Sequence, residues 1–138
     1  MQATGTPSTA DQVATFIHQL YDAFLERDWD RLETMFVDDY QQIDERRGVW
    51  FRGDPREILG TQRAEIEAAE TYDHRIEDLD ARALTDDVGV ATYVWFADGR
   101  WDGVDYHIRC PATTVVRRTP TGWRAAVIHA VQTEERSA

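Results

Sequence analysis

The sequence has 138 residues and a formal net charge of -11, with 42% hydrophobic and 11% aromatic residues. This length and apolar content suffice for one domain with a packed core. The acidic balance argues against nucleic acids and anionic membranes as partners, because both are bound through clustered cations. The single cysteine, Cys110, excludes an internal disulfide and a multi-cysteine zinc site. The chain starts without a signal-peptide pattern and has no apolar run of bilayer length, so we expect a cytoplasmic protein.

The first part of the chain predicts two helices after a polar N-terminal tail over residues 1–10. Apolar residues recur at helical spacing over residues 13–24 and form one wide face. Ser8 or Thr9 can cap this helix, and the spacing Thr9-x-x-Gln12 fits a capping box. The acidic turn at residues 28–30 then supplies the cap of a short second helix.

A third helix is predicted by the segment Asp54-Pro55-Arg56-Glu57. This segment combines an N-cap acid, a proline at the first helical position and an acid three residues after the cap. We expect the helix to run to about residue 69. One strand, around residues 40–43, separates it from the second helix.

The pattern changes to long strands from Tyr72 onward. They are expected over residues 73–84, 88–96, 104–118 and 123–132. In the first of them Ile76 and Leu79 are three residues apart, which indicates a bulge. The second is apolar on both faces, as in a strand that is covered on both sides. We place the hairpin turn that follows it at Asp98-Gly99-Arg100.

Two segments resemble the NTF2-like superfamily, which includes SnoaL-like polyketide cyclases and ketosteroid isomerases. Residues 21–44 show an apolar helix, a D-x-D turn and then L-x-x-x-F-x-D-D, like the start of those proteins. The segment V-V-R-R-x-x-x-G-W-R resembles the closing hairpin of the SnoaL-like members. The resemblance implies an α+β fold shaped like a cone, with three N-terminal helices packed on a curved, mostly antiparallel sheet. It covers a single domain over residues 11–133, with a C-terminal tail over residues 134–138.

The resemblance also implies a largely apolar pocket for a small hydrophobic ligand. Asp44 stands where ketosteroid isomerases have their catalytic base, and a carboxylate at a pocket mouth can take a proton next to a carbonyl. The alternative is that Asp44 begins a surface turn. The two oxyanion donors of those isomerases have no match here. Leu20, one residue before Tyr21, stands at the position of the first donor, and Thr113 or Thr114 lies near the position of the second. Steroid isomerisation is therefore not expected.

His107 and His129 are the predicted acid–base partners of Asp44. They lie on the last two long strands, which the turn at residues 119–122 makes neighbours. SnoaL-like proteins often carry an inward histidine near the position of His129. Whether either ring faces the pocket depends on strand register. The alternative is a half-buried histidine with a structural hydrogen bond.

No metal or other cofactor is expected. Asp44, His107 and His129 have the side-chain types of a two-histidine, one-carboxylate site, but no local spacing requires such a site. His18 and His74 are expected at the surface.

Ligand contacts are predicted for Tyr21, Trp50, Trp95 and Arg109. The three aromatic side chains would line a pocket for a planar molecule, and Arg109 would meet an anionic group. Core packing and cross-strand ion pairs are the alternative roles of the same residues.

A homodimer is expected because the strand over residues 88–96 has two apolar faces. Tyr93 and Trp95 share one face, and Val94 and Phe96 share the other. If the first pair lines the cone, a second copy of the chain is the simplest cover for the outer pair.

Three interpretations remain open at this stage. One is an acid–base enzyme of the isomerase, cyclase, dehydratase or hydrolase type that acts on a small hydrophobic metabolite. The second is a non-catalytic dimeric module that binds a ligand or helps an assembly form, and the third is a structural dimer whose pocket is vestigial. A polar cluster inside an apolar cavity would favour the enzyme, and a cavity filled by side chains would favour the module.

Overall fold

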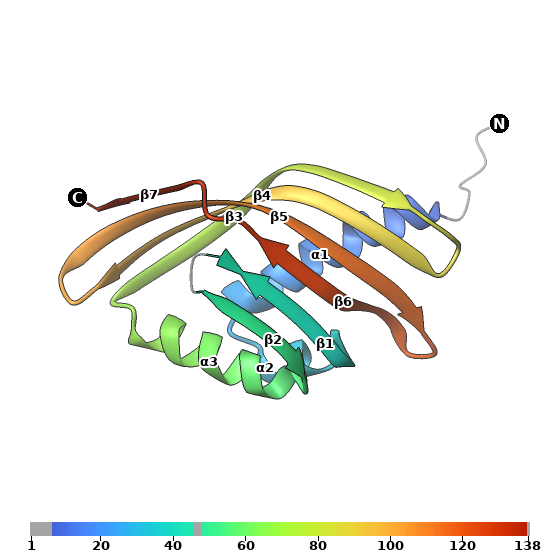
Figure 1. The fold of residues 1–138 in the computed structure, drawn as a ribbon, viewed down its shortest axis with the longest axis horizontal. Coiled ribbons are helices and arrows are strands. Elements are labelled where there is room, and N and C mark those ends of the chain that lie inside the picture. The colour runs from blue at the N-terminus through green and yellow to red at the C-terminus, as the bar shows by residue number, and fades with distance from the viewer. Residues whose placement is uncertain (1–6, 46–47, 138) are drawn as a thin grey trace.

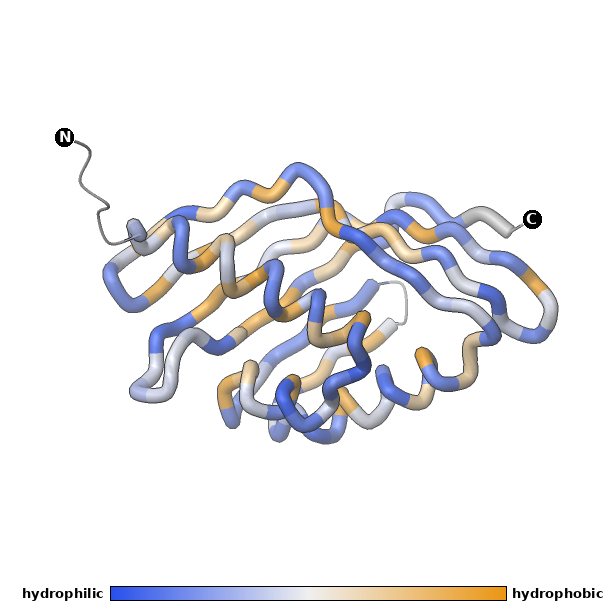
Figure 2. The backbone as a smooth tube through the Cα atoms, turned by 180° about the vertical axis from the view of Figure 1, so that it is seen from behind, coloured by the Kyte–Doolittle hydropathy of each residue, from blue (hydrophilic) through white to orange (hydrophobic). Residues whose placement is uncertain are grey.

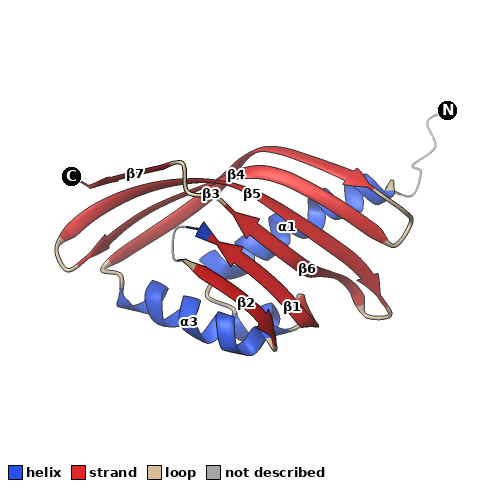
Figure 3. Cartoon of the chain, in the orientation of Figure 1, coloured by secondary structure: helices blue, strands red, loops and turns tan. Residues whose placement is uncertain are grey.

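The computed structural model describes residues 7–45 and 48–137 of the chain. Its elements in chain order are α1 (Thr9–Leu25), α2 (Trp29–Glu33), β1 (Phe36–Asp44), β2 (Val49–Gly53), α3 (Pro55–Ala68), β3 (Thr71–Ala83), β4 (Val88–Trp101), β5 (Val104–Thr119), β6 (Gly122–Ala130) and β7 (Glu134–Ser137). Figures 1 and 3 show a long, curved sheet with the helices on one side of it. The predicted α+β architecture, with three helices on a curved and mostly antiparallel sheet, is confirmed.

The strands follow the spatial order β2-β1-β6-β5-β4-β3, and β7 pairs with β5 beside the end of β6. β1 and β6 run parallel, whereas the other pairs are antiparallel. Because partners in a ladder share a face of the sheet, this register decides which side chains face the helices.

Local capping signals place the helix starts. Ser8 caps α1, since its hydroxyl accepts from the Asp11 amide at 3.1 Å and the Asp11 carboxylate accepts from the Ser8 amide. The capping box therefore lies one residue earlier than the predicted Thr9-x-x-Gln12. α1 begins inside the predicted N-terminal tail over residues 1–10. Residues 1–6 of that tail lie outside the described part of the chain. Asp28 and Asp54 cap α2 and α3 as predicted.

The predicted turn at Asp98-Gly99-Arg100 is wrong, because these residues pair with β5 inside a longer β4. The turn lies at Asp102-Gly103, where both residues have positive φ (50° and 78°). Such a pair forms the two-residue turn whose twist matches a hairpin. The predicted bulge in β3 is present, with a register shift between Glu77 and Asp80.

The C-terminal segment 134–138 was expected to be a tail, but Glu134–Ser137 forms β7; residue 138 lies outside the described part. β6 ends at Ala130, where Val131 donates its amide hydrogen to the Pro111 carbonyl at 2.9 Å. β5 continues past this point, so its edge is open for β7.

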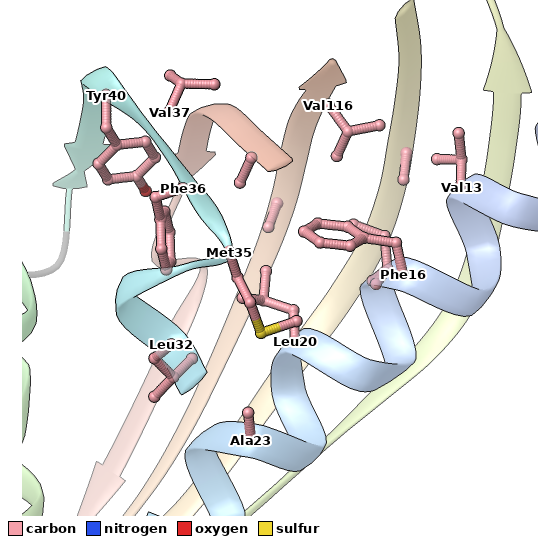
Figure 4. Packing of buried hydrophobic residues seen from close by; sticks show 14 of the residues in the cluster. Val13, Phe16, Leu20, Ala23, Leu32, Met35, Phe36, Val37, Tyr40 and Val116 are labelled. Carbon is pink, nitrogen blue, oxygen red and sulfur yellow. The ribbon is translucent and has the colours of Figure 1, made fainter. Parts of the chain in front are cut away.

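The core lies between α1, α2 and the sheet. Figure 4 shows Phe16 and Leu20 of α1 opposite Met35 and Phe36, at the start of β1. In Figure 2, which shows the chain from behind, hydrophilic and hydrophobic residues alternate along α1 as it crosses the strands. Tyr21, near the end of α1, packs against this core from the wall of a cavity. No helix in the described part of the chain combines the length and apolarity that a membrane span requires.

Candidate functional site

A cavity of about 110 Å³ lies between the sheet, α1 and α3. Its walls are mostly apolar or aromatic, and a few polar side chains reach it from several elements. The lining residues come from α1 (Tyr21, Phe24), β1 (Phe36, Gln42, Asp44), α3 (Gln62, Glu65, Ile66), β3 (Tyr72, His74), β4 (Trp95, Ala97, Trp101), β5 (Ile108, Cys110) and β6 (Ile128, Ala130). An apolar cavity with few convergent polar groups is the usual form of a small-molecule site.

β1 brings two of the polar groups, Gln42 and Asp44, to the cavity wall. They are two residues apart on a strand and therefore point to the same side. In the parallel ladder they pair with Ile128 and Ala130 of β6, which line the same wall. The carboxylate of Asp44 thus belongs to the cavity, at the end of β1.

His74 is buried in the cavity wall, with 6% of its surface exposed, so its expected surface position is wrong. Its Nε2 lies 2.9 Å from the backbone carbonyl of Tyr21, which can only accept a hydrogen bond. Nε2 therefore carries the hydrogen. Burial lowers the pKa of His74, so the ring is neutral at pH 7 and its Nδ1 accepts from the Tyr72 hydroxyl at 3.1 Å.

A chain of hydroxyl groups leads from the cavity into the core. The Tyr21 and Tyr93 oxygens are 2.5 Å apart, and Tyr93 is 2.7 Å from the Thr114 hydroxyl. Burial raises the pKa of Tyr93 to about 12 and also raises the pKa of Tyr21. Both phenols therefore stay protonated. If Thr114 donates to Tyr93 and Tyr93 donates to Tyr21, the Tyr21 proton remains available to a ligand.

Trp101 closes one part of the cavity by linking β4 to α3. Its indole N–H donates to the Glu65 carbonyl at 3.0 Å. The ring lies over Gly99, where any Cβ would overlap it. Gly99 therefore interrupts the strand's side-chain pattern so that the indole can reach α3.

The structure brings three of the predicted site residues together. Tyr21, Asp44 and Trp95 all line the cavity. Trp95 pairs with Cys110 and shares the inner face of the sheet with it. Strand register places Asp44 and Trp95 in the cavity wall, and Tyr21 reaches the same wall from α1. The roles predicted for these residues stay predictions.

Four other predicted site residues lie on the outer face of the sheet: His107, Arg109, His129 and Trp50. His129 pairs with Ile43, whose neighbours Gln42 and Asp44 face inward. Trp50 also pairs with Ile43 and is 70% exposed. The sheet therefore separates these four side chains from Asp44, and the predicted partnership of His107 or His129 with Asp44 is not formed.

The two outer histidines are also far from each other. His129 pairs with Thr113, six residues along β5 from His107, which corresponds to about 20 Å. His107 instead contacts the Asp98 carboxylate through Nδ1 at 2.5 Å. Arg109 donates to the Thr133 hydroxyl at 2.8 Å. Among the described residues no group of three or more His, Cys, Asp or Glu side chains is placed to hold a metal ion.

The sequence prediction missed Gln42, Tyr72, His74 and Trp101. One signal could have found two of them. Tyr72 and His74 lie four and two residues before Ile76 on the same strand, so they share its face, and Ile76 packs against the core. Gln42 could have been found from its spacing to Asp44 on the same strand. Trp101 could not, because its position depends on the misplaced hairpin turn.

Comparisons with solved structures place this fold among known proteins. A proposed scytalone dehydratase from Novosphingobium aromaticivorans DSM 12444 is 12% identical, with a TM-score of 0.78 over 91% of this chain and 84% of that chain. A proposed dehydratase of the NTF2-like family from Streptomyces avermitilis is 18% identical, with a TM-score of 0.78 over 91% and 96%. The hexachlorocyclohexane dehydrochlorinase LinA-type3 from Novosphingobium barchaimii LL02 is 13% identical, with a TM-score of 0.75 over 91% and 90%. The fold is therefore the NTF2-like cone.

The family follows from the sequence match. The model of the SnoaL-like domain matches residues 13–131, which is most of the chain. This protein belongs to the SnoaL-like domain family, as its opening and closing segments predicted. The comparison with curated protein sequences found no match.

Proposed function

We propose that the protein is an acid–base enzyme that removes a proton from carbon in a small, largely apolar molecule, in an elimination or isomerisation. One observation carries the proposal: Asp44, Tyr21 and Tyr72 all line the same apolar cavity. A base and one hydrogen-bond donor beside a small ligand are the minimum set for such chemistry, and in this proposal they are Asp44 and Tyr21.

Asp44 is the proposed general base. Tyr21 is the proposed donor to the oxygen or leaving group on which negative charge develops, and its raised pKa keeps it protonated throughout the working pH range. Tyr72 gives its own proton to His74, so its oxygen offers lone pairs to a hydroxyl or polarised C–H of the ligand. His74 acts in this scheme by positioning Tyr72 and the Tyr21 backbone.

The names of the compared structures support an elimination. Dehydratase and dehydrochlorinase both denote the loss of a proton and a leaving group. Their low identities to this chain show a shared fold alone, so the support from this chain's own residues is decisive.

The test is hydrogen–deuterium exchange at the α-carbons of cyclohexanone in D₂O, followed by NMR. The wild type should accelerate the exchange, and Asp44→Asn should abolish the acceleration. Asp39→Asn is the matched control, because Asp39 is an exposed residue of the same strand. Equal exchange in the wild type and Asp44→Asn would refute the proposed base.

The alternative function is a non-catalytic dimeric module that binds a ligand or helps an assembly form, and the outer face of the sheet supports the dimer that this module requires. Val94 pairs there with Pro111, and Val115 pairs with Val127. All four side chains are only partly buried in the single chain. We propose that a second copy covers them, and dimerisation is compatible with either function.

A further inference from the structure

Gln42 is a buried polar side chain in the cavity wall, with 6% of its surface exposed. Its amide oxygen, Oε1, already has two donors. The Tyr40 hydroxyl donates to it at 2.8 Å and Gln62 Nε2 lies at 3.4 Å. Burial raises the pKa of Tyr40, so this hydroxyl remains a donor.

These two donors fix the orientation of the amide. With Oε1 turned toward Tyr40 and Gln62, the Nε2 group points the other way. Nε2 has no hydrogen-bond acceptor among the described residues. In that part of the chain every fully buried side-chain nitrogen or oxygen has a partner, so Nε2 is not fully buried. Nε2 must therefore be accessible from the cavity. It is a pre-oriented donor on an apolar wall, where an unmade hydrogen bond is costly.

We propose that Gln42 Nε2 binds the carbonyl oxygen of the substrate, and that the substrate is a small, uncharged carbonyl compound with a C–H next to that carbonyl. This inference rests on the proposed function, because it uses Asp44 as the base. Residues two apart on a strand are about 7 Å apart. Between Gln42 and Asp44, this distance leaves room for a hydrogen bond to a C=O group and for the C–H next to that carbonyl.

The cavity limits the size and charge of this compound. A cavity of about 150 Å³ can hold benzene, so the volume of about 110 Å³ suits one small ring or a short chain. The described lining residues include neither lysine nor arginine, and His74 is neutral. A carboxylate or phosphate would therefore lose its hydration there without gaining a cationic partner from them.

The proposed step is a balanced proton transfer. Asp44 takes the proton from the α-carbon, the C–H electron pair forms a C=C bond, and the carbonyl pair moves onto oxygen. The Gln42 N–H group then faces an oxyanion, where its hydrogen bond is stronger than in the ketone. In D₂O the protonated Asp44 exchanges with solvent and returns deuterium to the α-carbon.

The test compares cyclohexanone, carbonyl-labelled with ¹³C, with methylenecyclohexane, which has the same shape without the oxygen. In the wild type we expect the bound ketone to show a lower C=O stretching frequency than in an alkane solvent. Gln42→Leu should remove that shift and weaken ketone binding roughly 3- to 10-fold, the effect of one net hydrogen bond. The dissociation constant of methylenecyclohexane should change less than about 2-fold.

Two further variants distinguish loss of the Gln42 hydrogen bond from a change in side-chain packing. Gln41→Leu makes the same substitution one residue away on the exposed face and should change neither dissociation constant. Tyr40→Phe keeps the ring but frees the amide to rotate, so the bound carbonyl band should broaden and its shift decrease. Tyr40 would then be a positioning residue.

The outcomes distinguish this inference from the function on which it rests. An unchanged C=O frequency and ketone affinity in Gln42→Leu would overturn the role of Gln42, even if Asp44-dependent exchange is observed. A Gln42-dependent frequency shift without exchange would support Gln42 as a ligand contact and refute the proposed enzyme. Failure of both compounds to bind the wild type would contradict both.

Discussion

At the scale of single residues, the site depends on a histidine that acts through its neighbours. His74 donates to the Tyr21 carbonyl and accepts from the Tyr72 hydroxyl, so one neutral ring fixes a residue of α1 and a residue of β3. A protonated ring could not accept from Tyr72, and its charge would be poorly solvated in the wall. The arrangement therefore requires the neutral form.

This requirement predicts a pH dependence of stability. Because burial lowers the pKa of His74 below its ordinary 6.5, the unfolded chain takes up this proton at a higher pH than the folded one. The contribution of His74 is complete above pH 6.5 and is lost as the pH falls toward the lower folded pKa. Urea unfolding from pH 7.5 to 5 should show a steeper loss of unfolding free energy in the wild type than in His74→Gln. Parallel curves for the two proteins would contradict a neutral buried histidine. His18→Gln, at an exposed position, is the control.

At the scale of elements, the cavity depends on how β4 reaches α3. The Trp101 ring lies over Gly99 and its N–H is hydrogen-bonded to α3. One residue without a side chain therefore lets a strand and a helix share an aromatic wall. A larger residue at Gly99 would have to displace that wall.

Gly99→Ala should consequently destabilise the protein by about 1–3 kcal/mol, the typical cost of overpacking. Urea unfolding measures this change, and tryptophan fluorescence reports any displacement of Trp101. Gly60→Ala is the matched control, since a Cβ at Gly60 in α3 meets no atom within 4 Å. That substitution should stabilise the helix by up to about 1 kcal/mol. Equal effects of the two substitutions would contradict the close approach of Trp101 to Gly99.

At the scale of the whole molecule, the sheet has two faces with different roles. The inner face carries the core and the cavity, while the outer face carries partly exposed apolar residues such as Val94 and Phe96. Arg75 and Arg109 lie near the Phe96 ring, at 4.3 and 6.0 Å from its centre. We expect this mixed face to be the dimer interface.

Sedimentation at micromolar concentration should therefore give twice the chain mass of 15.9 kDa. Val115→Asp should shift the protein to monomer, because it places a charge on the covered face. Thr121→Asp, in the β5–β6 turn, is the control for the added charge. A wild-type monomer under these conditions would contradict the proposed interface.

Much of the fold could be predicted from the sequence because its signals are local. Asp28, Asp54 and Pro55 start their helices through contacts within one turn, and the apolar periods identify the long strands. The hairpin turn was predicted at Asp98-Gly99-Arg100, but the strand pairing places it at a second Asp-Gly pair, Asp102-Gly103.

The site could be predicted only in part because faces and partners are set by register. Asp44 and Trp95 were found from a family resemblance and from aromatic content. His129 was assigned to the same site, but its pairing with Ile43 turns it outward. His74 was missed because its partners, Tyr21 and Tyr72, come from different elements whose packing the sequence does not specify.

The most direct test of the proposed site is the rate of α-hydrogen exchange of cyclohexanone in Asp44→Asn relative to the wild type. If Asp44 is the base in this cavity, the enzyme-dependent rate should fall by roughly 100-fold or more, the usual contribution of a positioned general base. Asp39→Asn should keep the wild-type rate, and both variants should unfold at similar urea concentrations. A wild-type rate in Asp44→Asn, or an equal loss in Asp39→Asn, would show that the chemistry does not depend on the cavity carboxylate.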